Sequence, residues 1–135
     1  MSNDVIHEEN ACPINGITEL LSRKWVFGIV KDMFSGKKHF NEFKEGKPEM
    51  SNASLSNTLK YLEIQEIIVK NVLENDSQTV TEYTLTDKGL KMNMLLYEIV
   101  LYGLYVLEDN LRSEDYKNEI RQAYEEILNI DDSKT

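Results

Sequence analysis

Apolar residues recur every three or four positions over most of the chain, which is the spacing of helices with one buried face. Pro13 suits a first helical turn, where its missing N–H has no partner to lose, and Gly36 suits the end of a helix. The pattern predicts helices over residues 13–21, 24–34 and 40–44, followed by helices that begin at Ser51, at Thr86 and at Ser113.

The helix that begins at Ser51 has two unlike faces. Leu55, Leu59 and Leu62 are spaced by four and three positions, so they share the buried face. The opposite face is small and polar, with Ser54 at one edge, and consists of Ala53, Ser56, Asn57 and Lys60. Such a face is either an ordinary solvated surface or a surface short enough to enter a groove of another molecule.

Two strands are expected after this helix. Residues 67–73 are rich in Ile and Val, residues 80–85 alternate in character, and the polar residues 74–78 between them suit a hairpin turn. The order of elements is helix, helix, short strand, helix, helix, hairpin, long helix and final helix. This order predicts an α+β, mainly helical fold, a winged helix-turn-helix.

The long helix that begins at Thr86 carries an apolar stripe broader than one small domain usually needs, which favours a partner helix. The stripe includes Leu90, Met94, Tyr97, Leu101, Leu104 and Leu111. Tyr97, Tyr102 and Tyr105, together with Trp25, either line a small-molecule pocket or, as is commoner for aromatic residues at helical spacing, pack in the core or at a dimer interface.

The chain is expected to divide into three parts: a flexible segment over residues 1–11, a winged helix-turn-helix domain with dimerisation helices over residues 12–110, and a C-terminal helix over residues 111–135. No apolar run approaches the ~18 residues of a membrane span. The first ten residues carry acids and neither Lys nor Arg, unlike a secretory signal peptide. A cytoplasmic protein with no membrane partner is expected.

The net charge of -9 argues against a nucleic-acid partner until its distribution is considered. Residues 20–70 hold nine bases and six acids, whereas residues 1–19 and 71–135 are both acidic. The basic segment contains the predicted polar helix, and four of its lysines are candidates to position DNA through phosphates: Lys37, Lys38, Lys44 and Lys47.

The sequence shows no signature of catalysis or of a cofactor. It has no Gly-rich phosphate loop and no paired-carboxylate motif, and His7 and His39 have no metal-ligand spacing with each other or with Cys12. A single cysteine excludes an internal disulfide. We therefore expect neither an enzyme nor a metal site.

The polar helix carries side chains that suit double-stranded DNA. Asn can bond bidentately to adenine, and Lys pairs with guanine or phosphate. Ser51 could cap the helix while its N-terminal N–H groups meet a phosphate. The candidates on this helix are Ser51, Asn52, Ser54, Ser56, Asn57 and Lys60.

Several runs resemble the HxlR-type winged helix-turn-helix regulators over residues 12–105. They are Cys12-Pro13-Ile14, Lys24-Trp25, His39-Phe40-Asn41-Glu42-Phe43, Met50-Ser51 with Leu55, Leu59, Leu62 and Glu63, and Tyr83-Thr84-Leu85-Thr86-Asp87-Lys88-Gly89. The resemblance implies a homodimeric bacterial transcription regulator whose first and long helices form the dimer. It also implies that the hairpin tip, with Asn75, Ser77 and Gln78, reaches the minor groove or the backbone.

The chain departs from this family's pattern at three places. Ala53 stands where relatives tend to carry Arg or another long polar residue, Glu66 stands where the turn after the helix usually has Gly, and the hairpin tip has no cation. A residue other than Gly in a left-handed turn costs on the order of 1 kcal/mol, so the turn could be built differently. A wing without cations weakens phosphate binding.

Two alternatives stay open at this point. A winged-helix protein-interaction module with weak or lost DNA binding is favoured by the acidic flanks, by Ala53 and by the wing without cations. A ligand sensor is favoured by the tyrosines of the long helix. The resemblance also implies that Cys12 is a candidate sensor of oxidants or electrophiles; the alternative is an inert thiol.

Overall fold

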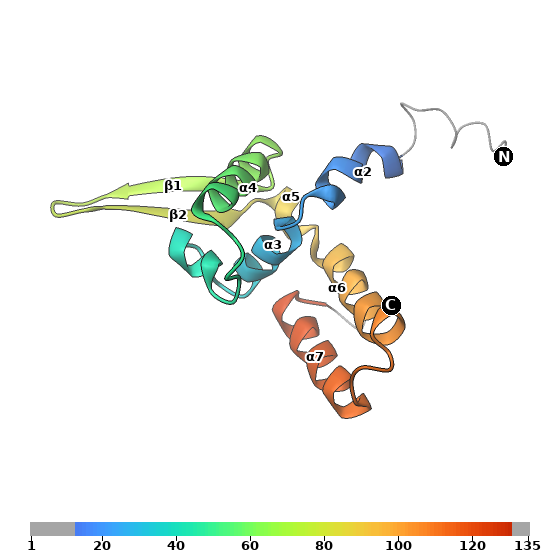
Figure 1. Ribbon diagram of the computed structural model, residues 1–135. Coiled ribbons are helices and arrows are strands. Elements are labelled where there is room, and N and C mark those ends of the chain that lie inside the picture. The colour runs from blue at the N-terminus through green and yellow to red at the C-terminus, as the bar shows by residue number, and fades with distance from the viewer. Residues whose placement is uncertain (1–12, 131–135) are drawn as a thin grey trace.

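The computed structural model describes residues 13–130, so the predictions for residues 1–11 and for Cys12 lie outside the described residues. The helices and the hairpin follow one another in the expected order (Figure 1). The elements are α2 (Pro13–Ser22), α3 (Val26–Phe34), the 3₁₀ helix η1 (Phe40–Lys44), α4 (Asn52–Ile64), β1 (Ile68–Glu74), β2 (Thr79–Leu85), α5 (Asp87–Leu90), α6 (Asn93–Tyr102), the π-helix η2 (Gly103–Leu107) and α7 (Glu114–Ile127). The short strand expected before the 40–44 helix is wrong: residues 37–39 make one backbone hydrogen bond to β2, from Tyr83 to Lys38, and form no strand of the sheet.

The core lies where α3, η1, α4 and the base of the hairpin meet. Ile29 of α3, Phe43 of η1 and Leu55 of α4 are fully buried there. The ring of Phe43 meets the ring of Tyr83 edge to face, with centroids 6.3 Å apart. Apolar burial of this kind supplies most of the driving force for folding, so the helical cluster and the wing form one unit.

The hairpin is a two-stranded antiparallel sheet in which Ile68 pairs with Leu85 and Glu74 pairs with Thr79. The backbone N–H of Tyr83 donates to the carbonyl of Lys38 at 2.8 Å, so the short extended piece before η1 lies against β2. The hairpin reaches far beyond the helices in Figure 1. The winged helix-turn-helix prediction is therefore confirmed.

Three helices begin where the sequence predicts, because a hydroxyl caps each of them. The side chains of Ser51, Thr86 and Ser113 accept hydrogen bonds from the backbone N–H groups of Ser54, Gly89 and Tyr116 respectively. Each bond satisfies an N–H that the helix itself leaves unpaired.

The prediction of one continuous helix from Thr86 to Leu111 is wrong in two ways: the helix is interrupted, and it ends earlier. A turn at residues 91–92 separates α5 from α6, and the last turn is a π-helix that ends at Leu107. The break follows close packing of α5 on the wing, because a Cβ at Gly89 would overlap the carbonyl oxygen of Ile67. Leu111 lies beyond the helix and is exposed.

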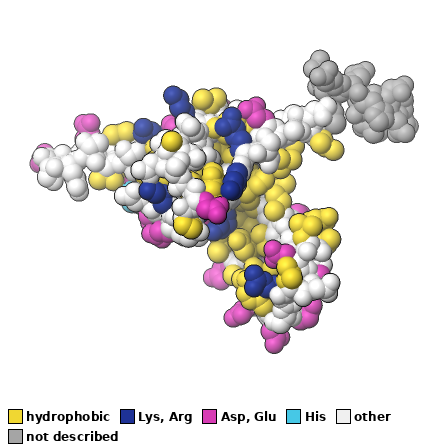
Figure 2. Space-filling model, viewed as in Figure 1, with side chains coloured by type: hydrophobic (Ala, Val, Ile, Leu, Met, Phe, Trp, Pro, Cys, Tyr) yellow, Lys and Arg dark blue, Asp and Glu magenta, His cyan; other side chains and the backbone are white. Residues whose placement is uncertain are grey.

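Helix α2 projects away from the rest of the chain in Figure 1, and none of its residues is buried. Residues Asp87–Leu107 are long and apolar enough to cross a membrane by length and composition alone, and the core helix of a soluble protein passes the same test. Figure 2 shows hydrophobic side chains gathered between α2 and α6.

Candidate nucleic-acid interface

Helix α4 presents the predicted polar face to solvent. Ala53, Ser56, Asn57 and Lys60 are all exposed, whereas Leu55, Leu59 and Leu62 face the core. Thr58 is buried and returns its hydroxyl to the carbonyl of Ser54 at 2.8 Å. Tyr61, on the same helix, is buried as well. The exposed face therefore has short side chains, which let the helix backbone come close to another surface.

The N-terminus of α4 is held by polar contacts. Ser51 Oγ accepts from the N–H of Ser54 at 3.0 Å and donates to Ser54 Oγ at 3.0 Å. Lys44 Nζ donates to Asn52 Oδ1, which ties η1 to the first turn of α4. Lys44 therefore places its positive charge beside the helix N-terminus, where a phosphate would also be attracted.

The C-terminus of α4 keeps a left-handed turn without Gly. Glu66 has φ of 61°, its N–H donates to Glu63 O at 2.9 Å, and the N–H of Ile67 donates to Leu62 O at 3.0 Å. These two bonds are the Schellman arrangement that normally takes Gly. Thr86 adds a hydrogen bond to Glu66 O at 2.6 Å, so bonds from the hairpin side offset the strain.

Two of the predicted positioning lysines, Lys37 and Lys38, form partly exposed ion pairs with acids. Lys37 Nζ lies 3.5 Å from Glu45 and Lys38 Nζ lies 3.6 Å from Glu82. Both pairs are partly exposed, and exposed pairs of this kind contribute little to stability and exchange readily for other anions. Lys37 and Lys38 therefore stay candidates for phosphate contact.

Lys47 has a structural role that its sequence position did not indicate. Its Nζ forms an ion pair with Asp32, which is 1% exposed, and donates to Phe43 O at 3.1 Å. Gly28 makes room for it, because a Cβ there would lie 3.3 Å from Lys47 Cε. The pair ties α3 to the loop before α4, so the prediction that Lys47 positions DNA is not supported by its geometry.

Lys31 joins the same group from α3. Its Nζ lies 2.9 Å from Asp32. Burial works to lower the pKa of Lys31, but the hydrogen bond and the charge of Asp32 outweigh it and raise the pKa above its ordinary value. Asp32 thus faces two ammonium groups, which compensate the burial of its carboxylate.

His39 and two glutamates connect η1 with the wing. Glu42 Oε1 accepts from the N–H groups of Lys38 and His39 at 3.1 and 2.9 Å, and lies 2.8 Å from His39 Nδ1. These hydrogen bonds to the carboxylate lower the pKa of Glu42. His39 Nε2 lies 3.7 Å from Glu82 of β2. His39 is therefore a packing and hydrogen-bonding residue.

Two basic residues near α4, Arg23 and Lys88, were not among the candidates predicted from the sequence. The guanidinium of Arg23 lies 3.8 Å from the ring centroid of Tyr61, and Lys88 Nζ donates to Gln65 O at 2.6 Å. Both contacts join segments far apart in sequence, so only the basic charge of residues 20–70 could have pointed to Arg23. Figure 2 shows Lys and Arg side chains on the face around α4.

The hairpin tip is polar and internally bonded. Asn75 Oδ1 accepts from the N–H groups of Ser77 and Gln78 at 3.1 and 2.8 Å, and from Ser77 Oγ at 3.2 Å. Asn75 and Ser77 therefore shape the turn as an Asx motif. The tip leaves the exposed Gln78 as the side chain best able to reach outward.

Among residues 13–130, no group of three or more His, Cys, Asp or Glu is placed to hold a metal ion. The described part of the chain thus offers a polar helix, basic residues around it and a wing. These features define a winged helix-turn-helix of the class that binds DNA.

The family follows from comparison with known proteins. The HxlR-like helix-turn-helix family matches residues 20–111, and the chain belongs to that family. It is 32% identical over 95 residues to YvaP of Bacillus subtilis strain 168, an uncharacterized HTH-type transcriptional regulator; the match covers 70% of this chain and 87% of YvaP. The resemblance found in the sequence is confirmed.

Two solved structures are also similar. The redox regulator HypR in its oxidized form superposes with a TM-score of 0.62 and 27% identity, covering 68% of this chain and 94% of that one. Diamide-treated YodB from B. subtilis superposes with a TM-score of 0.57 and 31% identity, covering 68% of this chain and 91% of that one.

Proposed function

We propose that this protein is a sequence-specific DNA-binding transcriptional regulator that acts as a homodimer. The exposed face of α4 carries the proposal, since Asn57 and Lys60 project from it beside the short side chain of Ser56. Asn57 would read a base edge and Lys60 a guanine or a phosphate. Membership of a regulator family supports this function.

The proposed backbone contacts surround this face. Ser51, Asn52 and Ser54 would meet phosphate at the helix N-terminus, Lys37 and Lys38 would contribute charge, and the wing residues would approach the neighbouring groove. The wing residues in this role are Asn75, Ser77 and Gln78. The proposal assigns no catalytic activity and places the protein in the cytoplasm, where its DNA would be.

The homodimer is supported by apolar side chains that one chain leaves uncovered. Ile14 of α2 is 71% exposed, and Met94, Tyr102 and Val106 are also exposed on α6 and η2. Exposed apolar residues concentrated on two helices are typical of an interface. A second copy would cover them and place two α4 helices on one DNA molecule.

Fluorescence anisotropy with DNA from upstream of the protein's own gene tests the proposal. We expect tighter binding to this DNA than to random DNA, and an affinity that falls steeply between two salt concentrations. Lys60→Gln should reduce the salt slope by about 1. Equal binding to both DNAs with little salt dependence would instead support a winged-helix protein-interaction module.

A redox response through Cys12 is a second part of the proposal, favoured by the likeness to HypR and to diamide-treated YodB. Two Cys12 thiols would lose two electrons and two protons to the oxidant and form an intersubunit disulfide. Diamide should then change the DNA affinity of the wild type and leave that of Cys12→Ser unchanged. The same response in both proteins would remove Cys12 from this role.

A further inference from the structure

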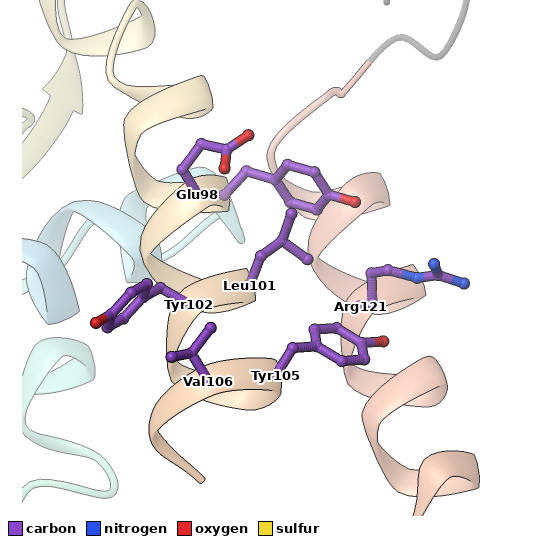
Figure 3. Close-up of a pocket in the computed structure, with 7 residues that line it drawn as sticks. Glu98, Leu101, Tyr102, Tyr105, Val106 and Arg121 are labelled. Carbon is purple, nitrogen blue, oxygen red and sulfur yellow. The ribbon is translucent and has the colours of Figure 1, made fainter. Parts of the chain in front are cut away.

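A groove between α6–η2 and α7 lies away from the α4 face. Its volume is about 600 Å³, within the range of small-molecule sites, and Tyr97, Leu101, Tyr102 and Tyr105 supply most of its wall. Arg121 of α7 closes the opposite side, and Figure 3 shows the ring of Tyr105 directed toward α7. Trp25 does not line the groove and packs against the core, which is the commoner of the two alternatives given for these aromatic residues.

The tyrosines of the groove are held from α7. Tyr97 donates its hydroxyl proton to Glu125 Oε1 at 2.7 Å, and Tyr105 donates to Asn118 Oδ1 at 3.3 Å. Their ring positions are thus fixed before any ligand arrives, which lowers the entropic cost of binding.

A charged network behind the groove also supports Tyr105. Lys117, 1% exposed, donates to the carboxylate and the carbonyl of Asp109 at 2.5 and 2.7 Å and lies 5.7 Å from the ring centroid of Tyr105. The hydrogen bond to Asp109 raises the pKa of Lys117 above its ordinary value, so the lysine stays charged. This network anchors the loop that joins η2 to α7.

Arg121 has a hydrogen-bond donor that no described residue satisfies. Its Nε is buried and has no hydrogen-bond partner among residues 13–130; Glu125 Oε1 forms an ion pair with it at 3.7 Å, which is beyond hydrogen-bond distance. A buried unsatisfied donor is costly, and it indicates a missing acceptor. The guanidinium fork fits a carboxylate, which can accept two parallel N–H bonds.

The backbone at the groove is unusual as well. Tyr105 and Val106 belong to the π-helix η2, in which the N–H of Glu108 donates to Gly103 O at 2.9 Å. Single π-helical turns are rare and are frequent at functional sites. The turn carries both residues into the groove wall.

We infer that this groove binds a planar aromatic carboxylate, whose ring packs against Tyr97 and Tyr105 and whose carboxylate pairs with Arg121. The exposed Glu98 at the rim opposes the anion and sets an upper limit on its affinity. Because Tyr102 and Val106 at the edge of the groove also belong to the exposed face assigned above to the second copy, the bound acid would alter the dimer and hence DNA affinity. This last step rests on the proposed function.

Isothermal titration calorimetry of the full chain with 2-naphthoate tests the site. We expect saturable binding by the wild type, a loss of roughly tenfold or more in Arg121→Gln, and tighter binding in Glu98→Gln. Arg112→Gln is the matched control. This substitution removes the same charge as Arg121→Gln, but Arg112 packs over Tyr116, outside the groove. It should bind 2-naphthoate as the wild type does.

Circular dichroism would establish that Arg121→Gln is folded. Val106→Trp fills the groove and leaves the charge of Arg121 in place, and it should abolish binding of 2-naphthoate as well. Equal binding of 2-naphthoate by the wild type, by Arg121→Gln and by Val106→Trp would overturn the inference. So would no binding at millimolar concentrations, or preference for 2-naphthylmethylammonium. DNA affinity measured without the acid separates this failure from a failure of the proposed function.

Discussion

The helix-turn-helix half of the protein and its α2–α6 half cover their apolar residues differently. Ile29 and Leu55 are fully buried between α3 and α4. Ile14 of α2 and Met94 of α6 are apolar and exposed. The first half is a complete structure within one chain, whereas the second presents a surface that a partner would cover. The predicted effects of substitution differ accordingly.

The largest effect is expected at Gly89, where α5 packs on the backbone of the wing. Gly89→Ala should lower the free energy of unfolding by about 3 kcal/mol, the upper end for overpacking, because Ile67 O must move. Gly103 is the control: apart from its own helix, no described heavy atom lies within 4 Å of a Cβ there. Gly103→Ala should therefore be neutral or stabilise by about 0.5–1 kcal/mol. Urea unfolding measures the free energy of unfolding of both variants. Equal losses of stability in Gly89→Ala and Gly103→Ala would contradict the prediction.

The next effect is on assembly. Met94→Lys places a charge on the exposed face of α6 and should weaken the dimer by about 2 kcal/mol, or roughly thirtyfold. Val72→Lys on the wing is matched, since Val72 is 53% exposed and Met94 is 46% exposed. Sedimentation equilibrium should show dissociation of Met94→Lys alone. Dimers of unchanged strength in both variants would place the interface elsewhere.

A smaller effect, of opposite sign, is expected at the end of α4. Glu66→Gly should raise the free energy of unfolding by about 1 kcal/mol, because Gly adopts positive φ without steric cost. Asn129, at φ of 55°, tolerates this conformation better, so Asn129→Gly should gain less. Thermal unfolding measures both, and a loss of stability in Glu66→Gly would show that the side chain matters more than the backbone.

The smallest effect depends on pH. Because the pKa of Glu42 is lowered in the folded chain, its carboxylate contributes stability at neutral pH that is lost as the pH falls below its ordinary value of 4.5. Glu42→Gln should be less stable than the wild type at pH 7, and the gap should close on acidification. A gap that is constant from pH 7 to pH 3 would assign the effect to packing.

The sequence predicted the helix-turn-helix half well because periodicity reports burial within one chain. Leu55, Leu59 and Leu62 were identified by spacing alone, and the hairpin by its polar turn. The breaks around α6 were not predictable, since they arise where Gly89 meets Ile67 and where η2 changes its hydrogen bonds.

Within the site, exposure of Asn57 and Lys60 followed from the helical period, whereas the partners of the lysines did not. Lys47 and Asp32 are fifteen positions apart, and their pairing depends on a loop and on the space left by Gly28. The sequence does not distinguish a lysine that faces DNA from a lysine that pairs with a buried acid. Only the tertiary contacts separate the two.

The central claim is that the exposed face of α4 reads DNA, and Asn57→Ala tests it most directly. Anisotropy with DNA from upstream of the protein's gene should show a loss of about 1–3 kcal/mol in specific binding, with binding to random DNA unchanged. Asn110→Ala, at an exposed asparagine outside the interface, should bind as the wild type does. Specific binding by Asn57→Ala that equals the wild type would contradict the claim.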